Sequence, residues 1–86
     1  MDINKLIAIV KKKLLDKITI ESIKIEDKTF LHKKHSGFQE GKFHLKLTID
    51  SKELIILGKI NGTKKIYRIL SEELKQFIHS IQILFR

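Results

Sequence analysis

Apolar residues recur along the chain with two different spacings, and each spacing predicts a different kind of element. Near the N-terminus, apolar residues follow Asp2 at intervals of three and four, which predicts a helix over residues 3–15 with Asp2 as its N-cap. Residues 43–50 instead alternate strictly, with Phe43 on one parity and His44 on the other. This alternation is typical of a strand that has one buried face and one polar face.

An earlier strand is predicted over residues 20–27. Its isoleucines change parity near Glu21 and Ser22, so either a bulge lies there or the strand proper begins there. This strand should pair antiparallel with residues 43–50. The intervening residues 28–42 keep no period and hold two glycines, which predicts a long connection. Loops of this length in so small a domain are usually functional or disordered.

Two helices and a last strand are predicted in the C-terminal half. Residues 54–60 are mostly apolar and end at the Asn-Gly pair of residues 61–62, which predicts a short helix closed by that glycine. A second helix is expected from a Thr63 cap to about Gln76, followed by a β-branched strand over residues 78–85. The two helices form a crossover, which allows the last strand to lie parallel to a neighbour.

Length and composition limit what such a chain can be. Eighty-six residues make a single domain, 1–86, with one small core. Apolar residues are 42% and charged residues 33%, which is typical of a globular chain rather than a disordered one. The longest apolar run, residues 54–57, is far shorter than the roughly 20 residues of a membrane span, and no signal peptide is visible. We therefore expect an α+β fold of order α-β-β-α-α-β, a three-stranded mixed sheet with helices packed on one face.

Charge and the lack of cysteine narrow the chemistry. Without cysteine the chain can form neither disulfides nor an all-cysteine metal site, and this composition fits a reducing cytoplasm. The net charge of +8 permits nucleic acid, an acidic protein surface or anionic lipid as a partner. Charge alone discriminates weakly between them. No catalytic constellation, dinucleotide fingerprint or P-loop is present. The segment from Gly58 to Gly62 is one residue too long for a KH-type GXXG loop, so a glycine helix cap is the favoured interpretation.

The four histidines carry the remaining chemistry. His32 and His35 lie in the long connection, and His44 opens the alternating strand on its polar face. His79 shares the parity of Ile81, which predicts that its side chain points toward the helix layer. A lone histidine in such a position is more often a core residue with a hydrogen-bond partner than a metal ligand. His32 and His35 are candidate chelators or simply polar loop residues.

The end of the chain resembles the BolA family. Residues 66–74 (IYRILSEEL) and then 78–83 (IHSIQI) are similar to that family's tyrosine, Glu-Glu-Leu and Ile-His-Ala-Leu pattern. Residues 44–47 resemble the family's strand start His-Phe-x-Val, and residues 26–29 resemble the end of its first strand. The resemblance spans nearly the whole chain. One departure is that the family commonly has Arg-His-Arg before its tyrosine, where residues 62–64 are Gly-Thr-Lys.

The resemblance implies a class II KH-like fold, no enzymatic activity, and pairing with a monothiol glutaredoxin through a shared [2Fe–2S] cluster. A chain without cysteine cannot hold such a cluster alone, so it would supply histidines to one iron while thiolates come from the partner. We expect no cluster in the isolated chain, which should be a monomer. The resemblance makes His79 the first candidate ligand and His32 the second, with His35 as the rival of His32.

For some members the resemblance also implies DNA binding and transcriptional regulation through a helix-turn-helix-like region. Lys59, Lys64, Lys65 and Arg68 cluster there and form a predicted basic stripe. Only Tyr67 offers an aromatic ring in that stretch, which argues against single-strand recognition by stacking. DNA-binding regulation is therefore the alternative hypothesis, and a hydrolase has no supporting constellation.

Overall fold

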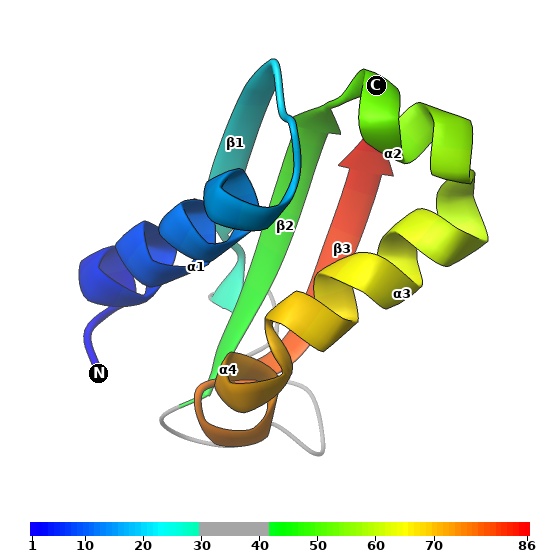
Figure 1. The fold of residues 1–86 in the computed structure, drawn as a ribbon. Coiled ribbons are helices and arrows are strands. Elements are labelled where there is room, and N and C mark those ends of the chain that lie inside the picture. The colour runs from blue at the N-terminus through cyan, green and yellow to red at the C-terminus, as the bar shows by residue number, and fades with distance from the viewer. Residues whose placement is uncertain (30–41) are drawn as a thin grey trace.

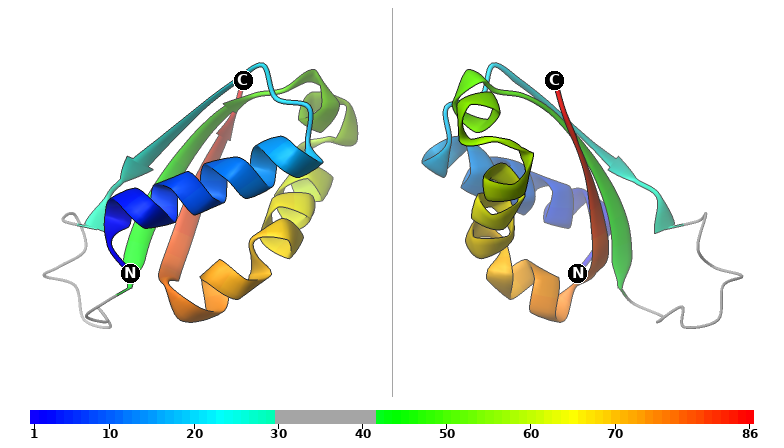
Figure 2. Two further views of the ribbon diagram at one scale, coloured as in Figure 1. Left: turned by 60° about the vertical axis from the view of Figure 1, so that its left-hand side comes forward. Right: turned by 90° about the vertical axis from the view of Figure 1, so that its right-hand side faces the viewer.

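Three strands form one sheet, and helices cover one of its faces, in a computed structural model that describes residues 1–29 and 42–86 (Figure 1, Figure 2). The order across the sheet is β1-β2-β3. β1 (Ser22–Asp27) pairs antiparallel with β2 (Phe43–Asp50), and β2 pairs parallel with β3 (Ile78–Phe85). The α+β class, the mixed three-stranded sheet and the single helix-covered face are therefore confirmed.

The N-terminal elements follow the sequence pattern closely. α1 (Ile3–Lys17) begins where the side chain of Asp2 accepts a hydrogen bond from the Lys5 amide, 2.9 Å away. Its inward stripe, Leu6, Val10 and Leu14, is fully buried. The parity change near Glu21 and Ser22 marks the start of β1 rather than a bulge within it.

The helical region between β2 and β3 differs from its prediction. α2 (Lys52–Leu57) ends at Gly58, whose positive φ of 89° favours glycine, and α3 (Lys59–Ile69) begins at the next residue. The predicted break at residues 61–62 was wrong, as was the Thr63 cap. Gly62 lies within α3 beside the ring of Phe85, where a Cβ would lie 3.1 Å from Phe85 Cε1.

The second predicted helix is also divided in two. α3 ends at Leu70, and α4 (Ser71–Gln76) follows at once. This turn leads the chain into β3, where the Phe43 amide donates to the Phe77 carbonyl at 2.8 Å. α4 is linked to α1 by Lys13, whose Nζ lies 2.7 Å from Oε2 of the buried Glu73. That contact raises the pKa of Lys13, first through the hydrogen bond with Glu73.

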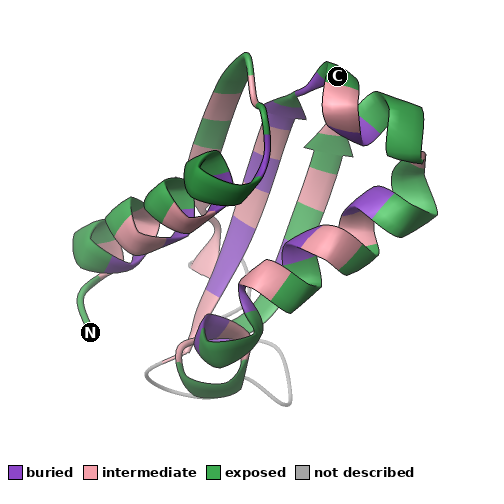
Figure 3. Ribbon diagram, in the orientation of Figure 1, coloured by how far each residue is buried: buried purple, intermediate pink, exposed green. Residues whose placement is uncertain are grey.

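The hydrophobic core lies between the helices and the covered face of the sheet (Figure 3). Every strand and each of the helices α1, α2 and α3 contributes apolar side chains to it. None of the helices in the described ranges has the length and apolarity needed to cross a membrane. The centre of the hydrophobic core is formed by fully buried residues, namely Leu6, Val10, Leu14, Leu45, Leu47, Ile49, Leu54, Ile66, Leu70 and Ile78.

Candidate functional site

Two histidines meet at the sheet face that no described helix covers. Nε2 of His44, on β2, lies 3.3 Å from Nδ1 of His79, on β3. The two rings are 4.8 Å apart between centroids and are inclined at 72°, an edge-to-face arrangement. His44 alternates with the core residues Phe43 and Leu45, so its side chain lies on the opposite face from the helices. We call His44 and His79 the imidazole pair.

His79 does not point toward the helix layer, so the parity prediction for it was wrong. Phe43 pairs with Ile78, but the next residue, His44, pairs with Ser80. His79 is therefore an extra residue in β3, a β-bulge that changes the parity of everything before it. It is exposed and contacts His44, whereas Ile78 and Ile81 on either side of the bulge are buried.

His44 is held in place by contacts on both sides. Its Nδ1 lies 2.7 Å from Ser80 Oγ, its amide donates to Thr29 Oγ1, and its carbonyl accepts from the Lys28 amide. The residue is only 5% exposed. When Nδ1 carries the proton and donates it to Ser80, Nε2 keeps a lone pair directed at His79. His44 was absent from the sequence-based candidates, although its place at the start of a polar strand face was visible.

The imidazole pair has a spacing suited to a metal. Two ligands of a tetrahedral metal, with metal–nitrogen bonds of about 2.0–2.1 Å, lie about 3.3–3.4 Å apart. The observed separation of 3.3 Å, which is also a hydrogen-bond distance between the two ring nitrogens, is close to this value. Within residues 1–29 and 42–86, no cluster of three or more histidine or carboxylate side chains is arranged to hold a metal. His32 and His35 lie outside the described residues.

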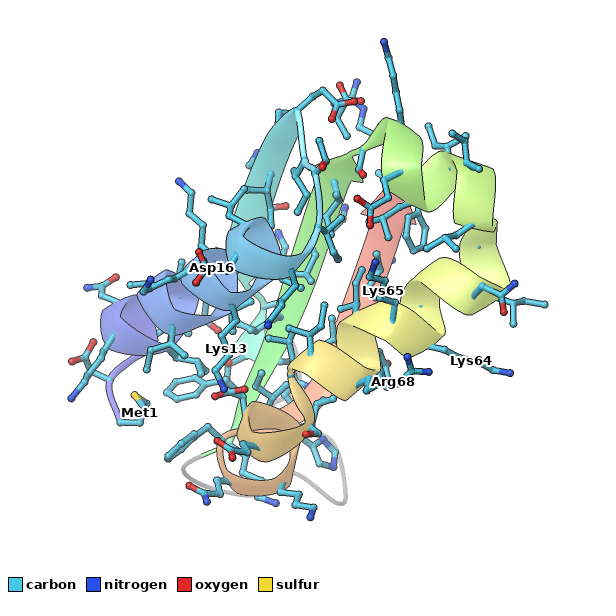
Figure 4. The ribbon with its side chains drawn as sticks, in the orientation of Figure 1. Met1, Lys13, Asp16, Lys64, Lys65 and Arg68 are labelled. Atoms are coloured by element: carbon cyan, nitrogen blue, oxygen red, sulfur yellow. The ribbon has the colours of Figure 1, made fainter. Side chains whose placement is uncertain are left out.

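The predicted basic stripe is divided by the structure. Lys64 and Arg68 are exposed along one side of α3, and Lys65 lies apart from them (Figure 4). The Lys65 Nζ is 2.7 Å from Oε2 of Glu53, on α2. That hydrogen bond, with a further one from the Thr19 amide, lowers the pKa of Glu53.

Two other side chains of α3 belong to the predicted DNA-binding region. Lys59 is exposed at the start of the helix. Tyr67, the ring considered for stacking on bases, donates its hydroxyl to the Ile81 carbonyl at 3.3 Å. The structure thus leaves Lys59, Lys64 and Arg68 as exposed cations in this region and engages Lys65 with Glu53.

Comparison with known proteins identifies the family. The family model described as BolA-like protein matches residues 14–86. The chain belongs to the BolA-like family. Among solved structures, BolA1 from Arabidopsis thaliana superposes with a TM-score of 0.74 and 23% identity, over 92% of this chain and 87% of that one. The BolA domain of SufE1 from Arabidopsis thaliana gives 0.73 and 25%, with the same coverage of each chain. No curated protein matches in sequence.

The BolA-like membership agrees with the motif that prompted it. The Ile-His-Ser-Ile segment of the BolA resemblance begins β3, and its histidine is half of the imidazole pair. The His-Leu-Lys-Leu segment begins β2 and supplies the other half. In the described residues, two BolA-like motifs contain a histidine. Their histidines, His44 and His79, are in contact on the open face of the sheet.

Proposed function

We propose that this chain is a non-enzymatic BolA-like adaptor that pairs with a monothiol glutaredoxin in the cytoplasm. It contributes histidine ligands to one iron of a [2Fe–2S] cluster that the two proteins share. The observation that carries this proposal is the 3.3 Å separation of the His44 and His79 ring nitrogens on the open face of the sheet. Two imidazoles on one iron, with thiolates on the other, is a known arrangement in Rieske centres.

Each residue of the site has a separate part in this proposal. His79 is exposed, so its ring can reach an iron that a partner protein holds. His44 is nearly buried, and Ser80 orients its ring through Nδ1, which leaves Nε2 as the ligating atom. His32 and His35 remain candidates for an additional or exchanging ligand. The cluster, when bound, supplies redox or transfer chemistry, whereas this chain binds and orients it.

The absence of cysteine explains why a partner is required. An iron–sulfur cluster needs soft thiolate ligands, and this chain offers none. A glutaredoxin contributes the thiolates and this chain contributes the imidazoles, so the two proteins supply different ligands to the same cluster. DNA binding remains the alternative, and no contact among the described residues favours it. The pairing of Lys65 with Glu53 engages one of its four predicted cations.

The test is reconstitution with a purified monothiol glutaredoxin, iron and sulfide under anaerobic conditions. We expect a one-to-one complex with the visible circular dichroism of a [2Fe–2S] centre that differs from that of the glutaredoxin alone. His79→Ala and His44→Ala should each abolish or alter that spectrum. Gln82→Ala is the matched control, because Gln82 is exposed on the same strand but lies away from the imidazole pair.

Three results would contradict the proposal. Both histidine variants folding and giving the wild-type spectrum would exclude them as ligands. A complex that forms but never holds a cluster would exclude the shared centre. Binding of a duplex DNA with affinity lowered strongly by salt, in the absence of any glutaredoxin complex, would favour the alternative.

A further inference from the structure

Within residues 1–29 and 42–86, no strand pairs with the outer edge of β3, and this edge differs in charge from the outer edge of β1. Both strands lie at the margins of the sheet, since the order is β1-β2-β3. β1 carries Lys24, Glu26 and Asp27, and charged side chains on an edge oppose pairing with other chains. Residues 78–85 contain no charged residue and no proline. An uncharged, β-branched edge strand is a site where another extended chain can add.

Backbone groups in the second half of β3 point away from the sheet. In a parallel ladder, alternate residues direct both amide and carbonyl to the same side. The Arg86 amide donates to the Ile49 carbonyl on β2, so Leu84 also faces β2, whereas Ile83 and Phe85 face outward. Tyr67 already occupies the outward carbonyl of Ile81. In the part of the chain that the structure describes, nothing pairs with the outward groups of Ile83.

A groove lies beside these free backbone groups. It has a volume of about 260 Å³ and is lined by the end of β3 together with α2 and the start of α3. The right-hand view of Figure 2 shows β3 in front of β2, with α2 and α3 to one side of it. Apolar side chains are exposed around the groove, with Ile55 at 56% and Leu84 at 48%. The lining residues are Leu54, Ile55, Lys59, Ile83, Leu84 and Phe85.

Charge indicates the nature of the occupant. The span 52–69 holds a single carboxylate, Glu53, which Lys65 neutralises. Lys59 is the cation that lines the groove, and Arg86 follows β3 directly. A second copy of this chain, which also carries +8, would bring like charges together. A single-stranded nucleic acid would find one aromatic ring in the lining, Phe85, and that ring packs on Gly62.

We propose that this groove binds an extended acidic peptide segment, which adds to the outer edge of β3 as a fourth strand. The Ile83 and Phe85 backbone groups hydrogen-bond to the segment, and its alternate apolar side chains enter the groove beside Ile55. Its acidic side chains point to the opposite side of the added strand, where the net charge of +8 on this chain attracts them. The groove lies about 13 Å or more from His79 along the strand, at about 3.3 Å per residue from His79 to Ile83. Binding there is therefore independent of the imidazole pair and of the proposed cluster.

The experiment measures binding of a labelled peptide of about ten residues that alternates valine with glutamate. A matched peptide alternates valine with lysine. We expect the acidic peptide to bind the full chain by fluorescence anisotropy and the basic one to bind at least about tenfold more weakly. Nuclear magnetic resonance should show that the Ile83 and Phe85 amides become protected from hydrogen exchange on binding. His79→Ala should leave the affinity unchanged.

Adjacent isoleucines provide the matched variants. Ile55→Ser, in the groove lining, should weaken binding about tenfold, the loss typical of a buried interface anchor. Ile56→Ser should change it less than about twofold, because Ile56 is 85% exposed and does not line the groove. Equal effects of the two variants, or binding without protection of Ile83 and Phe85, would overturn the proposal. So would a preference for single-stranded oligonucleotide over peptide, or self-association that protects the same amides without peptide.

Discussion

The alternating strand β2 presents apolar side chains to one face of the sheet and polar side chains to the other. On the helix side of β2, Leu45, Leu47 and Ile49 are at most 2% exposed. On the other side, Lys46 and Thr48 are half-buried, and His44 is 5% exposed without any described helix above it. Burial on one face comes from apolar packing against helices. On the other face, the His44 ring lies beside Ser80 and His79, which are polar neighbours on β3.

This difference separates stability from chemistry within one strand. Apolar contacts on the helix side contribute the main part of the folding free energy, because they remove large apolar surfaces from water. The open side places polar, ligating nitrogens where a partner can approach. A substitution on one face should therefore disturb stability and leave the chemistry, and a substitution on the other should do the reverse.

The largest expected effect tests the helix-covered face directly. Leu47→Ala should lower the free energy of unfolding by about 2–5 kcal/mol, because Leu47 is fully buried and truncation leaves a cavity. Lys46→Ala, one residue away on the open face, should change it by less than about 0.5 kcal/mol. Chemical denaturation of both variants measures the difference. Equal midpoints would mean that the two faces are not distinct.

A smaller effect is expected from the imidazole pair. His44→Ala should lower the free energy of unfolding by about 1–2 kcal/mol, because it removes buried hydrogen-bonding contacts and leaves Ser80 without its imidazole partner. His79→Ala should cost less than about 0.5 kcal/mol, since His79 is exposed. Thermal melts of the two variants give the comparison. Unfolding of the chain by His79→Ala would instead support a core role for that histidine.

The smallest expected effect on stability comes from Glu53, on α2, and it depends on pH. Glu53 has a lowered pKa in the folded chain, caused first by its hydrogen bond from Lys65 and then by that from the Thr19 amide. A carboxyl whose pKa is depressed by folding stabilises the folded state above its unfolded pKa and loses that contribution as pH falls. Glu53→Gln should therefore melt slightly below wild type at pH 7, and the difference should shrink below about pH 4.5, the ordinary value for this group. If the difference in melting temperature between wild type and Glu53→Gln grew at acidic pH, the pKa of Glu53 would not be lowered by folding.

Much of the fold could be predicted because its signals are local. The alternation of residues 43–50, the spacing of Leu6, Val10 and Leu14, and the β-branched run at 78–85 each report their own conformation. The bounds of β2 and β3 match the prediction. The helices between them do not, because Gly58 and Gly62 look alike in sequence. Only the structure shows that Gly58, with its positive φ, ends a helix, and that Gly62 lies inside α3 beside the Phe85 ring.

The candidate site was less predictable for a related reason. His79 was identified from the family motif, yet its direction was wrong because a bulge is a property of two paired strands and not of one. Lys65 was grouped with the exposed cations, but Glu53 from α2 engages it. His32 and His35 lie outside the described residues, so their part in the site stays a prediction.

The sequence by itself determined the apolar and polar faces of β2, the order of the strands along the chain and the resemblance to the BolA-like family, because these signals lie in residues that are close together along the chain. Tertiary structure alone decided that His44 and His79, which are 35 positions apart, lie with their nitrogens 3.3 Å from each other. That distance depends on the register between β2 and β3, and one unpaired residue in β3 sets this register at the point where the strands begin. The spacing of residues along a chain cannot report a register that only pairing creates.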